Sequence, residues 1–284
     1  MTASLRLHAP SALEYFATLV AEDEGLNLLE AAASIAQDDH PELDVQAVLH
    51  EVDALAQRLR RRLPADAAPS HRLRLLNRYF SEELGFAGNV NDYYERGNSY
   101  VHRVLATRRG IPIALAVIYL ELAAQIGLQA HGIAFPGHFL IKLHLPQGEV
   151  VLDPFTCQSL SREALEGALL PYREETGDAP LERYLRSATP RQVLVRMLRN
   201  LKEIHRSEGD WPRLLAVQQR LLLLLPSDAT EWRDRGLVLE ALGHWRGALA
   251  DLRRYLELRP EAGDAEQIGA KLRALQARDT PPLH

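Results

Sequence analysis

The chain has 284 residues, of which 46% are hydrophobic and 25% charged, a composition that supports one large or two modest globular domains. Its formal net charge of −5, with no long basic cluster, argues against a nucleic-acid partner. A single cysteine, Cys157, excludes an internal disulfide, and without a secretion-signal or membrane-span pattern we expect a cytoplasmic protein with no membrane partner.

Residues 1–70 are predicted to form an N-terminal helical region. Apolar residues recur at three- and four-residue spacing over Leu13–Leu29 and Val45–Leu59, which is typical of amphipathic helices. Pro41 lies between the two and marks a turn and a new helix start. The stretch Pro64–Ser70 is rich in turn-forming residues, so it is expected to be a loop.

Residues 71–188 mix helix and strand patterns. Ile111–Ile126 is apolar on nearly every face, which predicts a buried helix, and Pro112 suits its first turn. Three strands are expected after it, the last two joined by a hairpin loop at Pro146-Gln147-Gly148: Gln129–Phe135, His138–Leu145 and Glu149–Asp153. The predicted class is therefore α+β, with a buried helix packed on an antiparallel sheet.

Residues 189–284 contain an internal repeat. Gly209-Asp210-Trp211 returns 34 residues later as Gly243-His244-Trp245, and this is the tetratricopeptide period. The second unit also has Trp232, Gly236, Ala248 and Pro260 at positions typical of that repeat, whereas the first unit has Lys202 at the glycine position. A final helix over Glu266–Ala277 is expected to cover the open end, giving two repeats plus a capping helix.

Four short motifs in the middle region carry a family resemblance. They are Asn98-Ser99-Tyr100, Arg109-Gly110-Ile111-Pro112, Pro136-Gly137-His138-Phe139 and Leu152-Asp153-Pro154-Phe155. In this order they resemble the transglutaminase-like superfamily, which has a papain-like core. More narrowly, they resemble its bacterial branch that carries a tetratricopeptide tail and is associated with invasion-regulator genes.

The resemblance implies a catalytic triad from which one member is missing. Catalytic members open the buried helix with a cysteine, start a later strand with a histidine and end the next strand with an aspartate. A helix N-terminus stabilises the thiolate, the imidazole shuttles its proton and the carboxylate orients the imidazole. Here His138 and Asp153 match the last two, but Pro112 stands at the cysteine position, which makes the pair a relic.

Other sources of chemistry have weaker support. Cys157 lies four residues beyond Asp153, away from the helix, so it is interpreted as a packed or loop thiol. His131, His138 and His144 fall on neighbouring strands, but the spacing of a metal-binding motif is absent, so no metal and no cofactor are expected.

A polar, aromatic loop precedes the buried helix. If the core has a ligand cleft, its predicted walls are Tyr94, Asn98, Tyr100 and Arg109 beside His138. Arg109 has two open interpretations: it binds a ligand carboxylate in bidentate fashion, or it neutralises a neighbouring acid of the loop.

The expected function is that of a non-catalytic transglutaminase-like protein, a pseudoenzyme that serves as a protein-interaction or regulatory module through its cleft, its tail groove or both. The tail carries a small positive excess, which is compatible with an acidic peptide partner. The alternative is a hydrolase or amide-transfer enzyme that uses His138 and Asp153 with another nucleophile. A purely structural subunit of a larger assembly is a third possibility.

Overall fold

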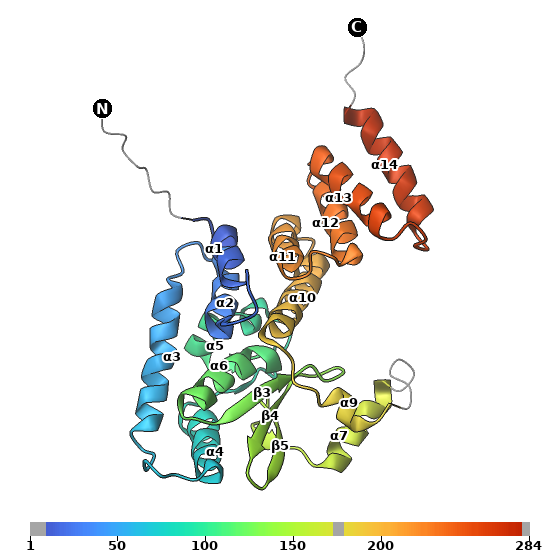
Figure 1. The fold of residues 1–284 in the computed structure, drawn as a ribbon. Coiled ribbons are helices and arrows are strands. Elements are labelled where there is room, and N and C mark those ends of the chain that lie inside the picture. Colours follow the sequence, from blue (N-terminus) through green and yellow to red (C-terminus); the bar gives the residue numbers. More distant parts are fainter. Residues whose placement is uncertain (1–9, 173–178, 280–284) are drawn as a thin grey trace, which may run out of the picture. The chain divides into compact units, whose positions relative to one another are not determined.

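The computed structural model describes residues 10–172 and 179–279 (Figure 1). The chain divides into two compact units, which we call the core unit (Ala21–Met197) and the tail unit (Met1–Val20 with Leu198–His284). Across the described ranges, no helix combines the length and apolarity needed to cross a membrane. The predicted division into residues 1–70, 71–188 and 189–284 stays a prediction.

Helix α6 (Pro112–Gln125) is the centre of the core unit, as its apolar sequence predicts. Every residue from Pro112 to Tyr119 is buried, and the next two, Leu120 and Glu121, are half-buried. Pro112 occupies the first position of the helix. Helices surround it: α2 (Leu28–Ser34), α3 (Val45–Arg60), α4 (Pro69–Asn77) and α5 (Val101–Thr107). Arg72 donates to the Ile126 carbonyl at 2.8 Å, so a free carbonyl just past the end of α6 is satisfied.

A four-stranded antiparallel sheet packs on α6 (Figure 1). Its order is β3 (Gln129–Ile133), β4 (Leu140–Leu145), β5 (Gly148–Asp153) and β6 (Gln158–Ser159). Leu145 pairs with Gly148, which leaves a two-residue hairpin loop at the predicted place. Between β3 and β4, residues 134–139 form a turn in which Gly137 has φ +66°, so the first two strands are shorter than predicted. Together with the helices, the sheet confirms the α+β class.

Short elements complete the core unit. Before α6 lie η1 (Ile35–Asp38), the π-helix η2 (Arg78–Glu83), η3 (Arg96–Ser99) and a two-residue parallel pair, β1 (Ala87–Gly88) with β2 (Arg109–Gly110). After the sheet lie α7 (Arg162–Leu169), η4 (Leu170–Tyr172) and α9 (Leu181–Tyr184). Ser161 caps α7, since its hydroxyl accepts from the Ala164 N–H at 3.2 Å.

The tail unit follows the predicted repeat. Helix α10 (Pro190–Glu208) enters it, and α11 (Trp211–Leu224), α12 (Ala229–Ala241), α13 (Trp245–Leu258) and α14 (Ala265–Asp279) follow. Gly209 and Gly243 adopt φ of +69° and +77° between helices, a conformation that favours glycine. Ile268, Leu272 and Leu275 of α14 are buried against the second repeat, which is the role expected of a capping helix.

The N-terminal segment departs from its predicted pattern. Instead of one helix over Leu13–Leu29, α1 (Ala12–Leu19) and α2 are separate, and Asn27 caps α2 through the Glu30 N–H at 3.0 Å. Gly25, with φ +77°, lies in the intervening turn. Helix α1 belongs to the tail unit, where the guanidinium of Arg220 lies 5.3 Å from the ring centroid of Phe16. Apolar spacing continues through the turn because both flanking helices bury apolar faces.

Candidate functional site

The two residues matched to the relic pair lie together in the core unit. His138 lies at the end of the turn that leads into β4, and Asp153 ends β5, so antiparallel pairing of these strands brings the two side chains to the same end of the sheet. His138 Nε2 lies 2.8 Å from Asp153 Oδ1. Asp153 also accepts from the Phe155 N–H at 2.8 Å and from the Thr156 hydroxyl at 3.1 Å. A carboxylate with three donors holds the imidazole in one orientation.

The surroundings of Asp153 favour its charged form. Burial, the largest single influence, raises the pKa of this carboxyl, but the hydrogen bonds from His138, Phe155 and Thr156 outweigh it and hold the pKa below its ordinary value. The side chain of His138 is 34% exposed and that of Asp153 only 13%. The imidazole is therefore reachable from solvent, whereas its orienting carboxylate is shielded.

No nucleophile stands where the family resemblance requires one. Pro112 is buried at the first position of α6, after Ile111 as the N-cap. Cys157 lies in the turn from β5 to β6 with φ +58°, and its Sγ is 3.9 Å from the Asn77 carbonyl oxygen. Burial raises the pKa of the Cys157 thiol above its ordinary value. The one cysteine is thus a protonated, packed thiol at neutral pH.

The four predicted cleft residues differ in burial and in hydrogen-bond partners. Asn98 is buried and organises the loop before it, because its Nδ2 donates to the Asp92 carbonyl at 2.6 Å. Tyr94 lies on that loop, 80% exposed. The buried Tyr100 donates its hydroxyl to Asp39 at 2.9 Å, and Arg109 donates to the carbonyls of Gly85 and Arg108. Both acceptors of Arg109 are backbone carbonyl oxygens, so these contacts involve neither a ligand carboxylate nor an acid of the loop.

Sequence reasoning missed the residues that enclose the pair. Arg196 of α10 donates from Nη2 to the carbonyl of His138 itself at 2.9 Å and from Nη1 to that of Phe135 at 3.1 Å. The ring of Tyr93 lies 6.1 Å from that of Phe155, and the Tyr172 hydroxyl lies over Gly137. Arg196 is 58 residues from His138 in sequence, so no spacing rule connects them.

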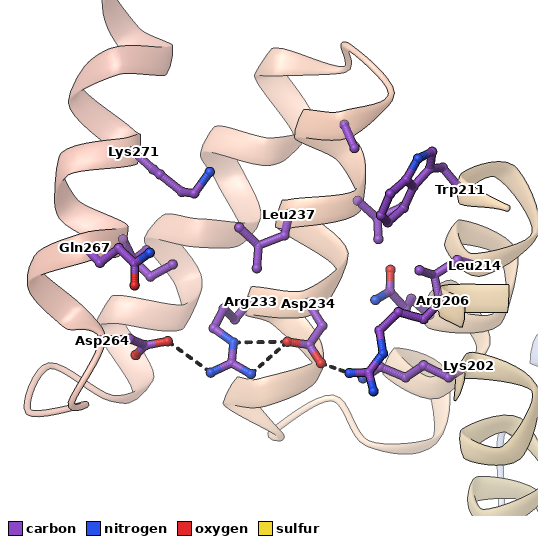
Figure 2. Close-up of a pocket in the computed structure, with 14 residues that line it drawn as sticks. Lys202, Arg206, Trp211, Leu214, Arg233, Asp234, Leu237, Asp264, Gln267 and Lys271 are labelled. Atoms are coloured by element: carbon purple, nitrogen blue, oxygen red, sulfur yellow. Dashed lines mark hydrogen bonds and ion pairs between the residues drawn. The ribbon is translucent and has the colours of Figure 1, made fainter. Parts of the chain in front are cut away.

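The tail unit has a pocket of about 440 Å³ on the face made by α10, α12 and α14, with α11 at one edge (Figure 2). We call it the tail groove. Its apolar surface comes from six side chains: Trp211, Leu214, Leu237, Val238, Ala241 and Ile268. The indole of Trp211 is 41% exposed, which is unusual for a large aromatic side chain.

Charged residues around the tail groove are paired within the protein. Figure 2 shows Arg233 between Asp234 and Asp264, with Lys202 bound to the other side of Asp234. Lys271 lies 2.7 Å from Glu240, which is outside the pocket. These cations have internal partners, so the tail groove does not present an uncompensated positive charge.

Metal binding has little support within the described residues. The predicted strand histidines His131 and His144 have ring centroids 5.5 Å apart, and Glu149 lies 3.2 Å from His144 Nδ1, but the three do not bring their ligand atoms together as a metal-binding group. The one group there with suitable spacing is His205, Glu208 and Asp210. Asp210 already accepts from the Arg213 N–H as the cap of α11 and pairs with the Arg213 side chain.

Comparisons with known proteins agree with this architecture. Residues 46–199 match the transglutaminase-like superfamily, and residues 201–273 match the tetratricopeptide repeat. A UPF0162 protein of Xylella fastidiosa (strain Temecula1) is 37% identical over 254 residues, or 88% of this chain and 90% of that protein. UPF0162 proteins of Vibrio cholerae (27% identity, 92% of this chain and 97% of that protein) and Escherichia coli (YchA; 28%, 82% and 86%) are also similar. The predicted resemblance to a bacterial branch is confirmed.

Among solved structures, the chain is similar to menin, whose crystal structure reveals the binding site for the Mixed Lineage Leukemia protein. The TM-score is 0.43 at 11% identity, covering 98% of this chain and 77% of menin. A likeness at this level indicates neither a common fold nor a common function.

Proposed function

The chain belongs to the transglutaminase-like superfamily, and the residue that we match to the catalytic cysteine of that superfamily is the buried Pro112. We therefore propose that the chain is a non-catalytic protein-interaction module that binds a partner segment in its tail groove. Tetratricopeptide repeats generally mediate protein–protein interaction. We place its action in the bacterial cytoplasm. The observation that carries the proposal is an apolar groove with an exposed tryptophan on the repeat face.

The chemistry of the tail groove favours an apolar anchor over a strongly acidic peptide. An acidic segment would have to compete with Asp234 and Asp264 for Arg233, and with Glu240 for Lys271. By contrast, an aromatic or aliphatic side chain of a partner would cover Trp211 and the neighbouring leucines without breaking an ion pair. The rim would then contribute hydrogen bonds that fix the orientation of the segment.

Selection from a random peptide display library on the full-length protein tests this proposal. We expect the enriched peptides to share an aromatic or aliphatic anchor. Binding of a synthetic enriched peptide is then measured by fluorescence anisotropy. Ala241→Arg places a long charged side chain in the tail groove from an exposed helix position, and we expect it to weaken binding at least about tenfold.

Ala277→Arg is the matched control, since it makes the same substitution at an exposed position of α14 that does not line the tail groove. It should leave the dissociation constant within about twofold. Failure to enrich any peptide, or equal binding by both variants, would remove the tail groove as the partner site.

A second candidate function rests on the His138–Asp153 geometry. An oriented imidazole is the usual general base, and with a bound water as nucleophile it would support hydrolysis of an ester or amide. A hydrolase screen compares wild type with His138→Ala while the melting temperature is followed. Turnover that disappears in the variant at an unchanged melting temperature would establish catalysis and overturn the non-catalytic proposal.

A further inference from the structure

Arg196 is a half-buried cation beside the relic pair. It bonds the carbonyl oxygens of Phe135 and His138, which are neutral acceptors. Among the described residues, no carboxylate lies within 4 Å of its guanidinium. Burial lowers its pKa, which reflects the cost of keeping this charge away from water. Within the described part of the chain, this partly desolvated guanidinium therefore has neutral acceptors and no carboxylate to compensate its charge.

The same cluster offers a second nitrogen to a ligand. Asp153 engages Nε2 of His138, so Nδ1 is the ring atom left on the opposite edge of an imidazole that is 34% exposed. Arg196 of α10 bonds the backbone carbonyl of this same residue, so its guanidinium lies beside the turn that carries the imidazole.

Aromatic side chains lie beside this cluster. Tyr93 lies close enough to Arg196 for the two groups to influence each other electrostatically, and its ring packs at 6.1 Å from that of Phe155. The N–H of Phe155 in turn bonds Asp153. Tyr93 is 42% exposed and its neighbour Tyr94 is 80% exposed. An anion that reaches Arg196 would therefore have phenol groups and apolar ring surface beside it.

We propose that Arg196 and His138 bind the carboxylate group of a ligand in the core unit, with Tyr93 covering the adjoining part of that ligand. A guanidinium matches a planar carboxylate with two parallel N–H donors, which a lysine at this position would not provide. Two sources share this chemistry: a free organic acid and the C-terminal carboxylate of a peptide. The proposal is independent of the tail groove, because all of its residues belong to the core unit.

Histidine ring signals in a carbon–proton correlation spectrum of the full-length protein provide the test, and His138→Asn identifies the signal of His138. The probes are sodium succinate, the peptide acetyl-Ala-Ala-Ala with a free carboxylate, and the same peptide as its C-terminal amide. Sodium chloride at matched ionic strength controls for screening. We expect a saturable shift of the His138 signal with at least one carboxylate and none with the amide.

Arg196→Gln should raise the dissociation constant at least about tenfold, because it removes a charged hydrogen-bond partner. Arg186→Gln, at an exposed position of the same unit, should leave it unchanged. Ala241→Arg should also leave it unchanged, which separates this site from the tail groove. Saturation by succinate alone assigns a free organic acid, whereas tighter binding of the free-carboxylate peptide assigns a protein C-terminus.

The proposal is overturned if neither carboxylate gives a saturable shift in the wild-type protein, or if the amide shifts the signal equally. Equal binding by a folded Arg196→Gln variant overturns it as well. The remaining histidine signals report whether that variant keeps the native fold. Where it does not, Arg196→Lys is used, and the wild-type comparison of acid with amide decides the outcome.

Discussion

The ammonium of Lys202 lies 2.6 Å from the carboxylate of Glu231, and both side chains are more than nine-tenths buried. Lys202 also contacts Asp234 at 2.7 Å. These contacts join α10 of the first repeat to α12 of the second. In the next repeat the equivalent of Lys202 is Gly236, which lies in close contact with Leu252. The first and second repeats are thus joined by a buried ionic cluster at this position, whereas the equivalent position in the second repeat lets the two helices of that repeat pack closely.

Removing one member of this cluster should destabilise the tail unit strongly. Lys202→Met keeps the side-chain volume but leaves Glu231 buried with only the half-exposed Arg199 as a cation, and we expect a loss of about 3 kcal/mol. Adding Glu231→Leu should recover most of that loss, because the buried charge is then absent. All three tryptophans lie in the tail unit, so urea unfolding followed by tryptophan fluorescence reports on it.

Arg254→Met is the control for this prediction, since Arg254 and Glu257 form an exposed pair on the same unit. Its effect should stay below about 1 kcal/mol. A loss from Lys202→Met as small as that of the control would mean that the buried cluster contributes no net stability.

The core unit should show a pH dependence that originates at Asp153. Its pKa is lower in the folded protein than in the unfolded chain, so its contribution is complete above an unfolded pKa of about 3.9 and is lost as pH falls through the folded value. Asp153→Asn should therefore be less stable than wild type at pH 7, by about 1–3 kcal/mol. Urea unfolding followed by circular dichroism should show the two curves converging below about pH 4.

Asp66→Asn, at an exposed loop position, serves as the comparison and should change stability at pH 7 by less than about 0.5 kcal/mol. Wild type and Asp153→Asn of equal stability at pH 7 would contradict a structural contribution from the His138–Asp153 pair.

Two glycines of the tail unit should respond in opposite directions to alanine. A Cβ at Gly236 would lie 2.8 Å from Leu252 Cδ2 and 3.2 Å from Asp251 Cβ, so α12 and α13 would have to separate. We expect Gly236→Ala to cost about 1–3 kcal/mol. At Gly269 the nearest atom is the flexible Arg273 Nη1 at 3.7 Å, so Gly269→Ala should stabilise α14 by up to about 1 kcal/mol. Tryptophan-monitored unfolding distinguishes the two signs, and a neutral Gly236→Ala would show that the helices pack less tightly there.

The thiol of Cys157 should react slowly with alkylating reagents in the folded protein. Because burial raises its pKa, little thiolate is present at pH 8. Alkylation by iodoacetamide, counted by mass spectrometry, should be at least about tenfold slower than in the protein unfolded in guanidinium chloride. As the single cysteine of the chain, it gives one unambiguous product. Equal rates in both states would indicate an accessible thiol and would reopen a catalytic role for Cys157.

Much of the fold was predictable because it is encoded by local periodicity. The all-round apolar pattern of Ile111–Ile126 indicated a helix that must be covered on every side, and α6 is that helix. Turn chemistry at Pro146-Gln147-Gly148 fixed the hairpin, and the 34-residue spacing fixed the repeat. The prediction of one helix over Leu13–Leu29 was wrong, because apolar spacing alone does not reveal a turn between two helices that both have apolar faces.

What the sequence by itself determined is which residues face a core, which two matched residues meet at the ends of β4 and β5, and that Pro112 opens the buried helix. Only the tertiary structure decided that α1 belongs with the tail unit, that Asn98 and Tyr100 bond other parts of the core, and that Arg196 reaches His138. The physical reason is that periodicity reports the polarity of a face but not the identity of the element that covers it. Hydrogen bonds between residues far apart in sequence depend on that choice of partner.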